Sequence, residues 1–225
     1  MVERVDATGT PLWSTTFPDI DKYTVAIPTT IGGAVATADG GAVLALNLYR
    51  TGFANRYAGA RKIDAAGEEV WQFGTNPKLV QVDGQASDLV GIPGSADVVL
   101  VTQKDGSTAT IRLDAAGKKV WTSNTYYSTQ FKQKIAEDRR ATALGLSDGG
   151  AIVGVTLAAP GSGDAGPWRP HLHRINGLGV VTWHRDLDQI GAAKLSRLVR
   201  RTDGALLAVG WIPTPAQEAS RLWLA

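Results

Sequence analysis

Short apolar runs alternate with glycine-containing turns along the whole chain. In the segments 109–114 and 171–176, the side-chain character changes with a period of two, and Asp-Gly or Gly-Gly pairs separate many of the apolar runs. A period of two is typical of a strand with one buried face, and Asp-Gly between apolar runs is a strong hairpin signal. The pattern therefore predicts antiparallel β-strands joined by tight turns.

The first part of the chain illustrates the expected unit. Its hydrophobic runs and turns predict four strands at about 33–38, 42–48, 58–64 and 69–73. We expect the first of these strands, which precedes the Asp-Gly-Gly turn, to be the innermost. Its residues are small and mostly apolar, which permits neighbouring inner strands to approach closely.

A ten-residue motif occurs four times. Each copy has a basic residue, an aliphatic residue and Asp or Asn, followed by Gly and then by Trp. The copies begin at Arg4, Lys62, Arg112 and Arg174, and they end at Trp13, Trp71, Trp121 and Trp183. A repeat at intervals of roughly 50 to 60 residues indicates one supersecondary unit, copied and packed against its neighbours.

Repeated units of four antiparallel strands are typical of propeller blades. We predict an all-β fold, a β-propeller with four blades of four antiparallel strands. The blades are expected at about 31–75, 84–125, 141–187 and 194–225, the last completed by 1–16. Pairing of the N-terminal and C-terminal strands would close the ring and remove unpaired sheet edges. The residues 1–225 then form a single domain. If the chain is instead cut from a longer protein, more blades could exist outside it.

Composition and charge exclude several classes of protein. The 225 residues are 44% hydrophobic, which is enough to fill a core, and they include no cysteine for a disulfide or thiolate site. The 23 basic and 21 acidic residues are too balanced to favour nucleic acid as a partner. We find no apolar window long enough for membrane insertion and no leader at the start. We predict a monomer without a cofactor.

Two segments together resemble a known group of repeats. Lys62-Ile-Asp-Ala-Ala-Gly-Glu-Glu-Val-Trp71 and Ser147-Asp-Gly-Gly-Ala-Ile-Val-Gly154 have the rhythm of bacterial β-propeller repeat proteins related in appearance to the quinoprotein-type propellers. The resemblance covers nearly the whole chain. It implies an exported or cell-surface protein, and it implies no particular ligand. The second unit departs from the rhythm at 92–96, where Pro-Gly-Ser replaces Asp-Gly-Gly.

The motif tryptophans allow two interpretations. Their rings are suited to stack on sugars, one in each blade. A large aromatic side chain at one fixed place in every unit also suits packing between blades, with the indole N–H bonded to a nearby acceptor. We prefer the packing interpretation.

Three other aromatic residues are candidate ligand-binding residues. Trp168 lies in a long polar insertion at 160–170, and Tyr126 and Tyr127 lie in the other long connection, at 124–140. Aromatic side chains exposed on loops are common binding anchors. The alternative, that each ring folds back over its own loop, stays open.

The histidines form one candidate metal pair. His171 and His173 alternate on a predicted strand and so share a face, but no third ligand is evident and we predict no metal site. The sequence also contains no Gly-x-Ser-x-Gly elbow and no phosphate-binding glycine loop.

These observations favour a non-catalytic binding or scaffolding propeller module, with a protein or glycan ligand. We expect it to be extracellular or at the surface of a bacterial cell. One alternative is a lectin-like glycan-binding module. Another is a hydrolase or lyase whose site lies at the channel mouth, since propellers collect catalytic groups from strands far apart in sequence.

Overall fold

The structure is a computed structural model, and it is built from β-strands. It describes residues 2–16, 30–49, 56–74, 82–104, 106–127, 141–158, 167–187, 192–212 and 221–224. Within these ranges we find no helix long and apolar enough to cross a membrane.

The strands form a two-stranded hairpin and four larger antiparallel sheets. The N-terminal hairpin consists of β1 (Val2–Val5) and β2 (Pro11–Thr15). Sheet I consists of β3 (Thr30–Ala36), β4 (Ala42–Tyr49), β5 (Arg56–Ile63) and β6 (Glu69–Phe73), with β7 (Val82–Asp83) paired to β5. Sheet II consists of β8 (Gln85–Gly91), β9 (Val98–Lys104), β10 (Ser107–Leu113) and β11 (Lys119–Tyr126). Sheet III consists of β12 (Thr142–Gly145), β13 (Ala151–Ala158), β14 (Trp168–Ile175) and β15 (Val181–Asp186), and sheet IV of β16 (Lys194–Arg200), β17 (Leu206–Ile212) and β18 (Arg221–Leu224).

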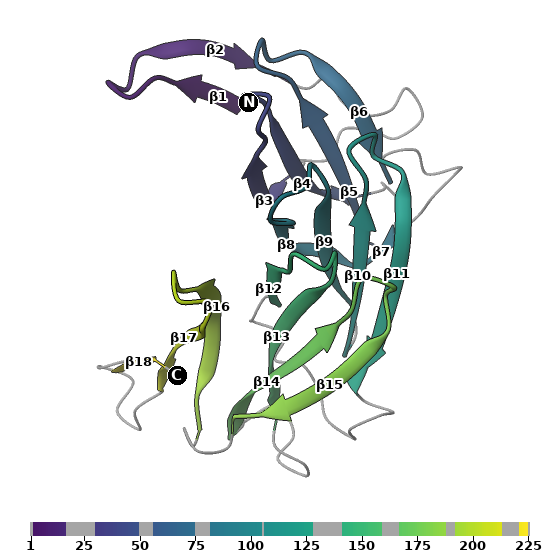
Figure 1. The fold of residues 1–225 in the computed structure, drawn as a ribbon, viewed down its shortest axis with the longest axis vertical. Coiled ribbons are helices and arrows are strands. Elements are labelled where there is room, and N and C mark those ends of the chain that lie inside the picture. Colours follow the sequence, from purple (N-terminus) through teal and green to yellow (C-terminus); the bar gives the residue numbers. More distant parts are fainter. Residues whose placement is uncertain are drawn as a thin grey trace.

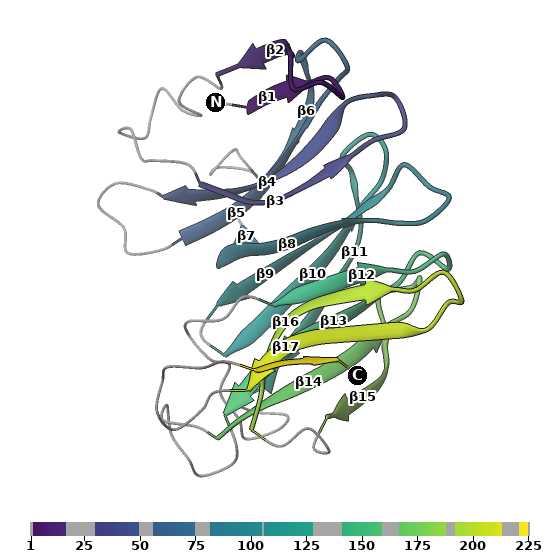
Figure 2. The ribbon, with the colours of Figure 1, turned by 90° about the vertical axis from the view of Figure 1, so that its left-hand side faces the viewer.

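The sheets follow one another around a curved arc in chain order (Figure 1). The first strand of each larger sheet lies on the inner side of the arc, and β3, β8, β12 and β16 contact one another in succession. Figure 2 shows the sheets succeeding one another from the hairpin downwards, with sheet IV in front of sheet III. The all-β fold and the blade-like sheets of antiparallel strands therefore agree with the prediction.

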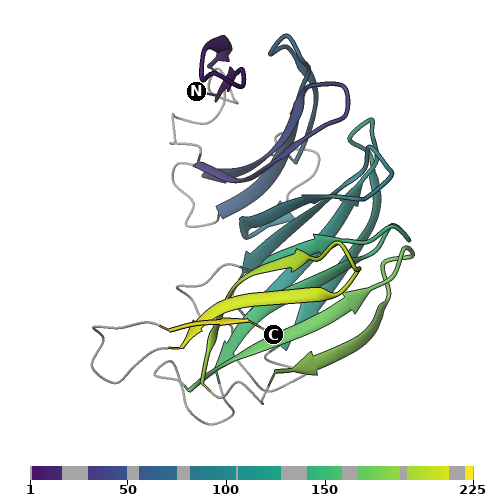
Figure 3. The same ribbon diagram turned by 60° about the vertical axis from the view of Figure 1, so that its left-hand side comes forward.

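The predicted closure of the ring is not present. Among the described residues, the N-terminal hairpin pairs only within itself, and sheet IV contains only its own three strands. The hairpin instead packs on sheet I, where Trp13 Nε1 donates to the carbonyl oxygen of Ala65 at 2.7 Å. It therefore stands at the opposite end of the arc from sheet IV (Figures 1 and 3).

The repeated motif produces the same local structure in each copy. It forms the turn between the two outer strands of a sheet, and the strand register shifts at the same point, for example between Lys62 and Ile63 and between Arg112 and Leu113. In the turn of sheet I, Asp64 Oδ1 accepts the amides of Ala66 and Glu68 at 2.8 and 3.0 Å. The carboxylate is thus a turn device, as its position in the sequence suggests.

The turn of the second unit forms although its sequence differs. Gly94 has a φ of 75° and the amide of Ser95 donates to the carbonyl oxygen of Ile92 at 3.1 Å. Gly94 supplies the left-handed conformation that Gly40 and Gly149 supply in the turns of sheets I and III, with φ of 81° in both. The departure therefore alters the residues of the turn and leaves the hairpin intact.

The core lies between successive sheets. Apolar side chains pack between sheets I and II, between II and III, and between III and IV. Small residues let the inner strands approach, as expected: a β-carbon at Gly145 would collide with the carbonyl oxygen of Gly91, and one at Gly33 would lie 2.9 Å from the amide nitrogen of Leu89. The fold is therefore held mainly by burial of apolar surface between neighbouring sheets.

Candidate functional site

Three of the motif tryptophans join each outer strand to the next sheet. Trp71 Nε1 donates to the carbonyl oxygen of Ala115 at 3.0 Å, as Trp13 does to Ala65. A β-carbon on the turn glycines Gly67, Gly117 or Gly179 would lie within 3.0 Å of the Trp13, Trp71 or Trp121 side chain. These contacts confirm packing between sheets for all three residues, and the indole hydrogen bond for Trp13 and Trp71.

Trp183 differs from these three. It lies on β15 with 37% of its surface exposed, whereas Trp121 at the same place on β11 is 8% exposed. Within the described part of sheet IV, no motif turn is present to cover its ring. Trp183 is therefore a large aromatic surface residue on the side of sheet III that faces sheet IV.

The candidate ligand residue Tyr127 is not at the surface. Its side chain is fully buried in the core between sheets II and III. The expectation that Tyr127 presents its ring to a ligand is therefore corrected, because the ring packs back against the neighbouring sheet. Tyr126, one position earlier on β11, is 51% exposed, as the alternation along a strand requires.

Trp168 is half-buried at the start of β14, and a lysine lies over its ring. The Lys194 ammonium lies 5.3 Å from the ring centroid of Trp168 and 5.1 Å from that of Trp211. A cation near aromatic faces at these distances is stabilised by the ring quadrupoles. Trp168 thus joins sheet III to sheet IV, and its role in ligand binding stays a prediction.

The histidine pair belongs to a polar layer between the outer strands of sheets II and III. We use this name for two groups of side chains that face one another across the two sheets. The first group is Thr108, Thr110, Ser123, Thr125 and Tyr127, and the second is His171, His173, His184 and Asp186. All of the first group are buried, as are His171 and His173, with 1% exposed each.

A carboxylate holds the orientation of His171. The Nδ1 atom of His171 lies 2.6 Å from Asp186 Oδ1. Burial lowers the pKa of His171, and this effect outweighs the opposite effect of the Asp186 carboxylate. His171 is therefore neutral at neutral pH, and its Nδ1–H donates to Asp186. The ring of His184 is stacked near His171, with the two ring centroids 6.0 Å apart.

His173 is held by the hydroxyl of Tyr127. The Tyr127 hydroxyl and His173 Nδ1 share a hydrogen bond of 3.1 Å, and Thr108 Oγ1 lies 3.4 Å from the same hydroxyl. Burial lowers the pKa of His173 to about 3, with a further contribution from the neighbouring His171 and His184. Burial also raises the pKa of Tyr127, so both partners are neutral.

Several buried polar atoms of this layer have no hydrogen-bond partner among the described residues. They include His173 Nε2, Thr110 Oγ1 and Thr125 Oγ1. Leaving a buried polar group unpaired costs about 1–3 kcal/mol. The junction between sheets II and III therefore carries an energetic penalty that an apolar junction would avoid.

The layer has the components of acid–base chemistry but not the exposure. A carboxylate–imidazole pair such as Asp186–His171 orients a general base in many enzymes. Here both imidazoles are covered by neighbouring strands, so protonation of either ring would place a charge between sheets II and III and weaken their packing. Among the described residues, no group of three or more His, Cys, Asp or Glu side chains could hold a metal ion.

The sequence points to the two histidines but not to their partners. Tyr127 is only a candidate for exposure in the sequence, with folding back left open, and Asp186 lies on a different strand from His171. A signal is present in the repeat: His171 and His173 stand where Ala109 and Ile111 stand in sheet II, counted back from the motif. Polar residues at positions that are apolar in another copy indicate a special junction.

A second feature lies on the motif turn of sheet III. Leu178, Val180 and Val181 are 82%, 56% and 39% exposed. In the turns of sheets I and II, the places of the two valines are taken by pairs of charged residues, 68–69 and 118–119. We call these three residues the apolar turn.

The comparisons with known proteins leave the family open. No family model and no curated protein matches the chain. Hydrazine synthase of Kuenenia stuttgartiensis is 12% identical with a TM-score of 0.49, over 89% of this chain and 61% of that one. An endo-arabinase from Bacteroides thetaiotaomicron is 13% identical with a TM-score of 0.49, over 83% and 71%. A eukaryotic initiation factor is 14% identical with a TM-score of 0.43, over 79% of this chain and 35% of that one.

Proposed function

We propose that this protein is a non-catalytic binding or scaffolding module of the propeller type, and that its ligand is another protein. The apolar turn carries this proposal. Large apolar side chains that cluster at a surface are typical of protein-binding sites. Aliphatic side chains offer a protein partner area to bury, and they offer no hydrogen bonds to a sugar or a nucleotide.

The repeat itself supports this choice of surface. The turns of sheets I and II have the same shape and carry Glu68-Glu69 and Lys118-Lys119 in the places of Val180-Val181. The turn therefore needs no valine to fold. Exposed valines at a position that accepts charge are explained by contact with a partner.

The setting follows from the repeat rhythm. The resemblance to bacterial propeller repeat proteins supports an exported or cell-surface protein, and a scaffold that presents a docking turn fits such a setting. We therefore propose a bacterial surface or extracellular module.

Selection of binding peptides tests the proposed ligand class. Peptides from a displayed library are selected on the wild-type protein. Their affinity is then measured for the double variant Val180→Lys/Val181→Lys, which carries the residues found at these places in sheet II. We expect apolar peptides that lose at least about tenfold in affinity for the variant, because each aliphatic side chain contributes about 1.5–3 kcal/mol when fully buried.

A matched control separates this turn from exposed valines in general. Val70→Lys/Val120→Lys changes two valines on β6 and β11 that are 53% and 49% exposed. We expect this control to bind the selected peptides as the wild type does. Peptides that bind all three proteins equally would show that the apolar turn is not the docking site.

Glycan binding is a second candidate because Tyr126 exposes half of its surface. A glycan array with the wild type and Tyr126→Ala tests it. Saturable binding that disappears in the variant would favour the lectin-like function over the protein ligand.

A further inference from the structure

Half of one strand edge in sheet IV has no partner. β17 pairs with β18 from Val209↔Leu224 to Ile212↔Arg221, and within the described residues Leu206–Ala208 have no partner on that side. In sheet I the same half of β4 is paired: Ala42, Val43 and Leu44 face Ile63, Lys62 and Arg61. Within the described residues, the third strand of sheet IV therefore covers only half of β17, and no fourth strand is described.

The N-terminal hairpin has the register of the missing part. When the motif copies are aligned, Val5 and Arg4 correspond to Ile63 and Lys62 of sheet I. When the turn Asp203-Gly204 is aligned with Asp39-Gly40, Leu206 corresponds to Ala42. A hairpin placed on sheet IV would thus pair Val5 with Leu206 and Arg4 with Leu207. β1 would continue along β17 beyond β18, with Glu3 beside Ala208, and β2 would supply the fourth strand. Val2 would lie outside this ladder, because Leu224 already pairs with Val209.

Residues of the N-terminal hairpin are exposed at places where the equivalent residues of sheets I, II and III are buried. Val5 is 50% exposed, whereas Ile63, Leu113 and Ile175 at the same place are fully buried. Gly9 has nothing within 4 Å of a β-carbon, whereas the equivalent Gly67, Gly117 and Gly179 each contact a tryptophan. Among the described residues, Trp183 is thus a motif tryptophan that no motif turn covers, and the motif turn at Gly9 covers no tryptophan.

Charge is complementary at the same junction. In sheets I, II and III, the basic residue of the motif pairs with an aspartate in the turn between the first two strands of the same sheet. The pairs are Lys62–Asp39 at 2.6 Å, Arg112–Asp97 at 2.7 Å and Arg174–Asp148 at 2.9 Å. The corresponding aspartate in sheet IV is Asp203, and the corresponding basic residue is Arg4 of the hairpin. At present Arg4 Nη1 bonds the carbonyl oxygen of Ala65, and Asp203 pairs with its neighbour Arg201 at 3.2 Å.

We propose that sheet IV is completed by the N-terminal hairpin of a second copy of this chain. The hairpin of each copy adds to β17 and β18 of the other, Trp183 covers the turn at Gly9, and Arg4 pairs with Asp203 across the interface. Each copy brings three complete sheets and one shared sheet, so a pair joined at both ends forms a closed ring of eight sheets. This departs from the monomer expected from the sequence, and it does not depend on the protein ligand proposed above.

The arc explains why the partner is a second copy. The hairpin of the same chain is already packed on sheet I, at the opposite end of the arc from sheet IV (Figures 1 and 3). Closure within one chain would require the packed junctions between sheets to rearrange. A second copy can offer its hairpin to sheet IV while the hairpin stays on its own sheet I, and the two interfaces are then identical, as in a two-fold symmetric dimer.

A charge exchange tests the proposal. We expect the wild-type chain to have twice the mass of 23.7 kDa in light scattering and sedimentation. Arg4→Asp and Asp203→Arg each place like charges at both interfaces, so each variant alone should dimerise about 100-fold more weakly or worse. A 1:1 mixture of the two variants should dimerise again, because one interface then has the exchanged pair and the other has the native pair.

The mixture distinguishes a second copy from closure within one chain. A wild type that stays monomeric at high concentration, or a mixture that stays monomeric while both variants keep the circular dichroism spectrum of the wild type, overturns the proposal. Trp183→Ala is a further variant and should weaken the dimer through lost apolar contact. Because the peptide test uses Val180 and Val181 instead, failure of the dimer leaves the proposed function standing, and failure of the peptide test leaves the dimer standing.

Discussion

β11 and β15 occupy the same place in neighbouring sheets but differ in what covers them. Each carries the tryptophan that ends the repeated motif, and Trp121 is 8% exposed while Trp183 is 37% exposed. The backbone is equivalent, since Arg112↔Trp121 and Arg174↔Trp183 pair in the same register. The difference lies in the next sheet around the arc: sheet III covers Trp121 with its motif turn, and the described part of sheet IV has no such turn for Trp183.

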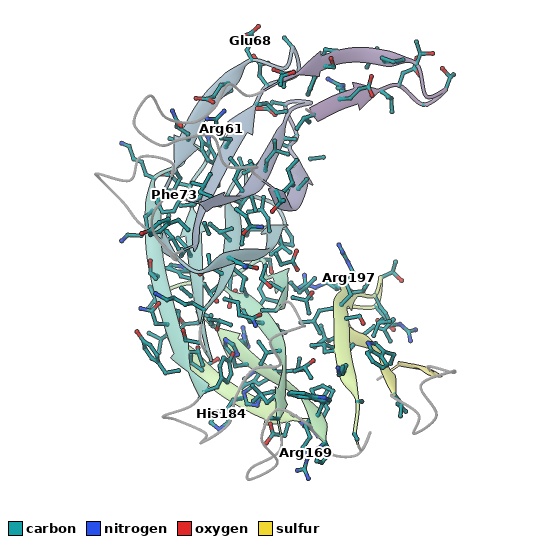
Figure 4. All side chains as sticks on the ribbon, turned by 180° about the vertical axis from the view of Figure 1, so that it is seen from behind. Arg61, Glu68, Phe73, Arg169, His184 and Arg197 are labelled. Carbon is teal, nitrogen blue, oxygen red and sulfur yellow. The ribbon has the colours of Figure 1, made fainter. Side chains whose placement is uncertain are left out.

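This difference indicates that the motif stabilises the junction between two neighbouring sheets and not one sheet alone. The motif tryptophan is buried where the following sheet supplies its turn, as for Trp121, and it is more exposed where the described part of that sheet supplies none, as for Trp183. Elsewhere the same residue is an exposed apolar surface available to a partner. Figure 4 shows His184 on β15 of sheet III and Arg197 on β16 of sheet IV, the two neighbouring sheets at this end of the arc.

Replacement of the two tryptophans should give the largest contrast. Trp121→Ala removes a buried ring and is expected to lower the free energy of unfolding by about 3–5 kcal/mol. Trp183→Ala is expected to cost clearly less, about 1 kcal/mol, at concentrations where the chain is monomeric, because more of its ring is already in water. Urea denaturation followed by circular dichroism measures both.

Equal losses in the two variants would contradict the comparison. They would mean that Trp183 is covered within one chain, as closure of the ring by its own hairpin requires. The denaturant slope serves as a control, since a change in stability alone should leave it unchanged.

Much of the fold could be predicted from the repeat. The strands expected at about 42–48 and 69–73 lie at Ala42–Tyr49 and Glu69–Phe73, because Asp-Gly turns and alternating side chains fix both ends of a strand. Ring closure could not be predicted in the same way. It depends on the angle between successive sheets, which is set by side chains such as Leu113 and Ile175 packing across each junction.

The candidate site was predicted only in part. The alternation of His171 and His173 correctly places both imidazoles on one face. The sequence leaves open which way Tyr127 points, because a tyrosine at the end of a strand looks the same in sequence whether it faces solvent or the next sheet. Its partner, His173, is 46 residues away and belongs to another sheet. Contacts between sheets of this kind leave no local pattern.

The polar layer should make stability depend on pH. His173 has a pKa of about 3 when folded, against 6.5 in the unfolded chain, so the unfolded state binds more protons below pH 6.5. The free energy of unfolding should therefore fall by about 2 kcal/mol between pH 7.5 and pH 5. His171 acts in the same direction, since burial also lowers its pKa despite Asp186.

Two variants sharpen this measurement. His173→Gln keeps an acceptor for the Tyr127 hydroxyl and removes the titrating ring, so the fall between pH 7.5 and pH 5 should shrink by about 2 kcal/mol. His184→Gln changes an exposed neighbour in the same layer and should keep most of the fall. An unchanged pH dependence in His173→Gln would mean that burial between sheets II and III does not lower the pKa of His173.

The smallest expected effect concerns a single buried hydroxyl. Thr110 is fully buried on β10, and its Oγ1 has no hydrogen-bond partner among the described residues. Thr110→Val keeps the shape of the side chain and removes the unpaired oxygen, so it should raise the free energy of unfolding by up to about 1 kcal/mol. Thr108→Val is the matched control, because Thr108 Oγ1 lies 3.4 Å from the Tyr127 hydroxyl and its loss should not stabilise the protein. A destabilised Thr110→Val would show that Thr110 Oγ1 is bonded in solution, and that the junction between sheets II and III is better satisfied than its buried atoms indicate.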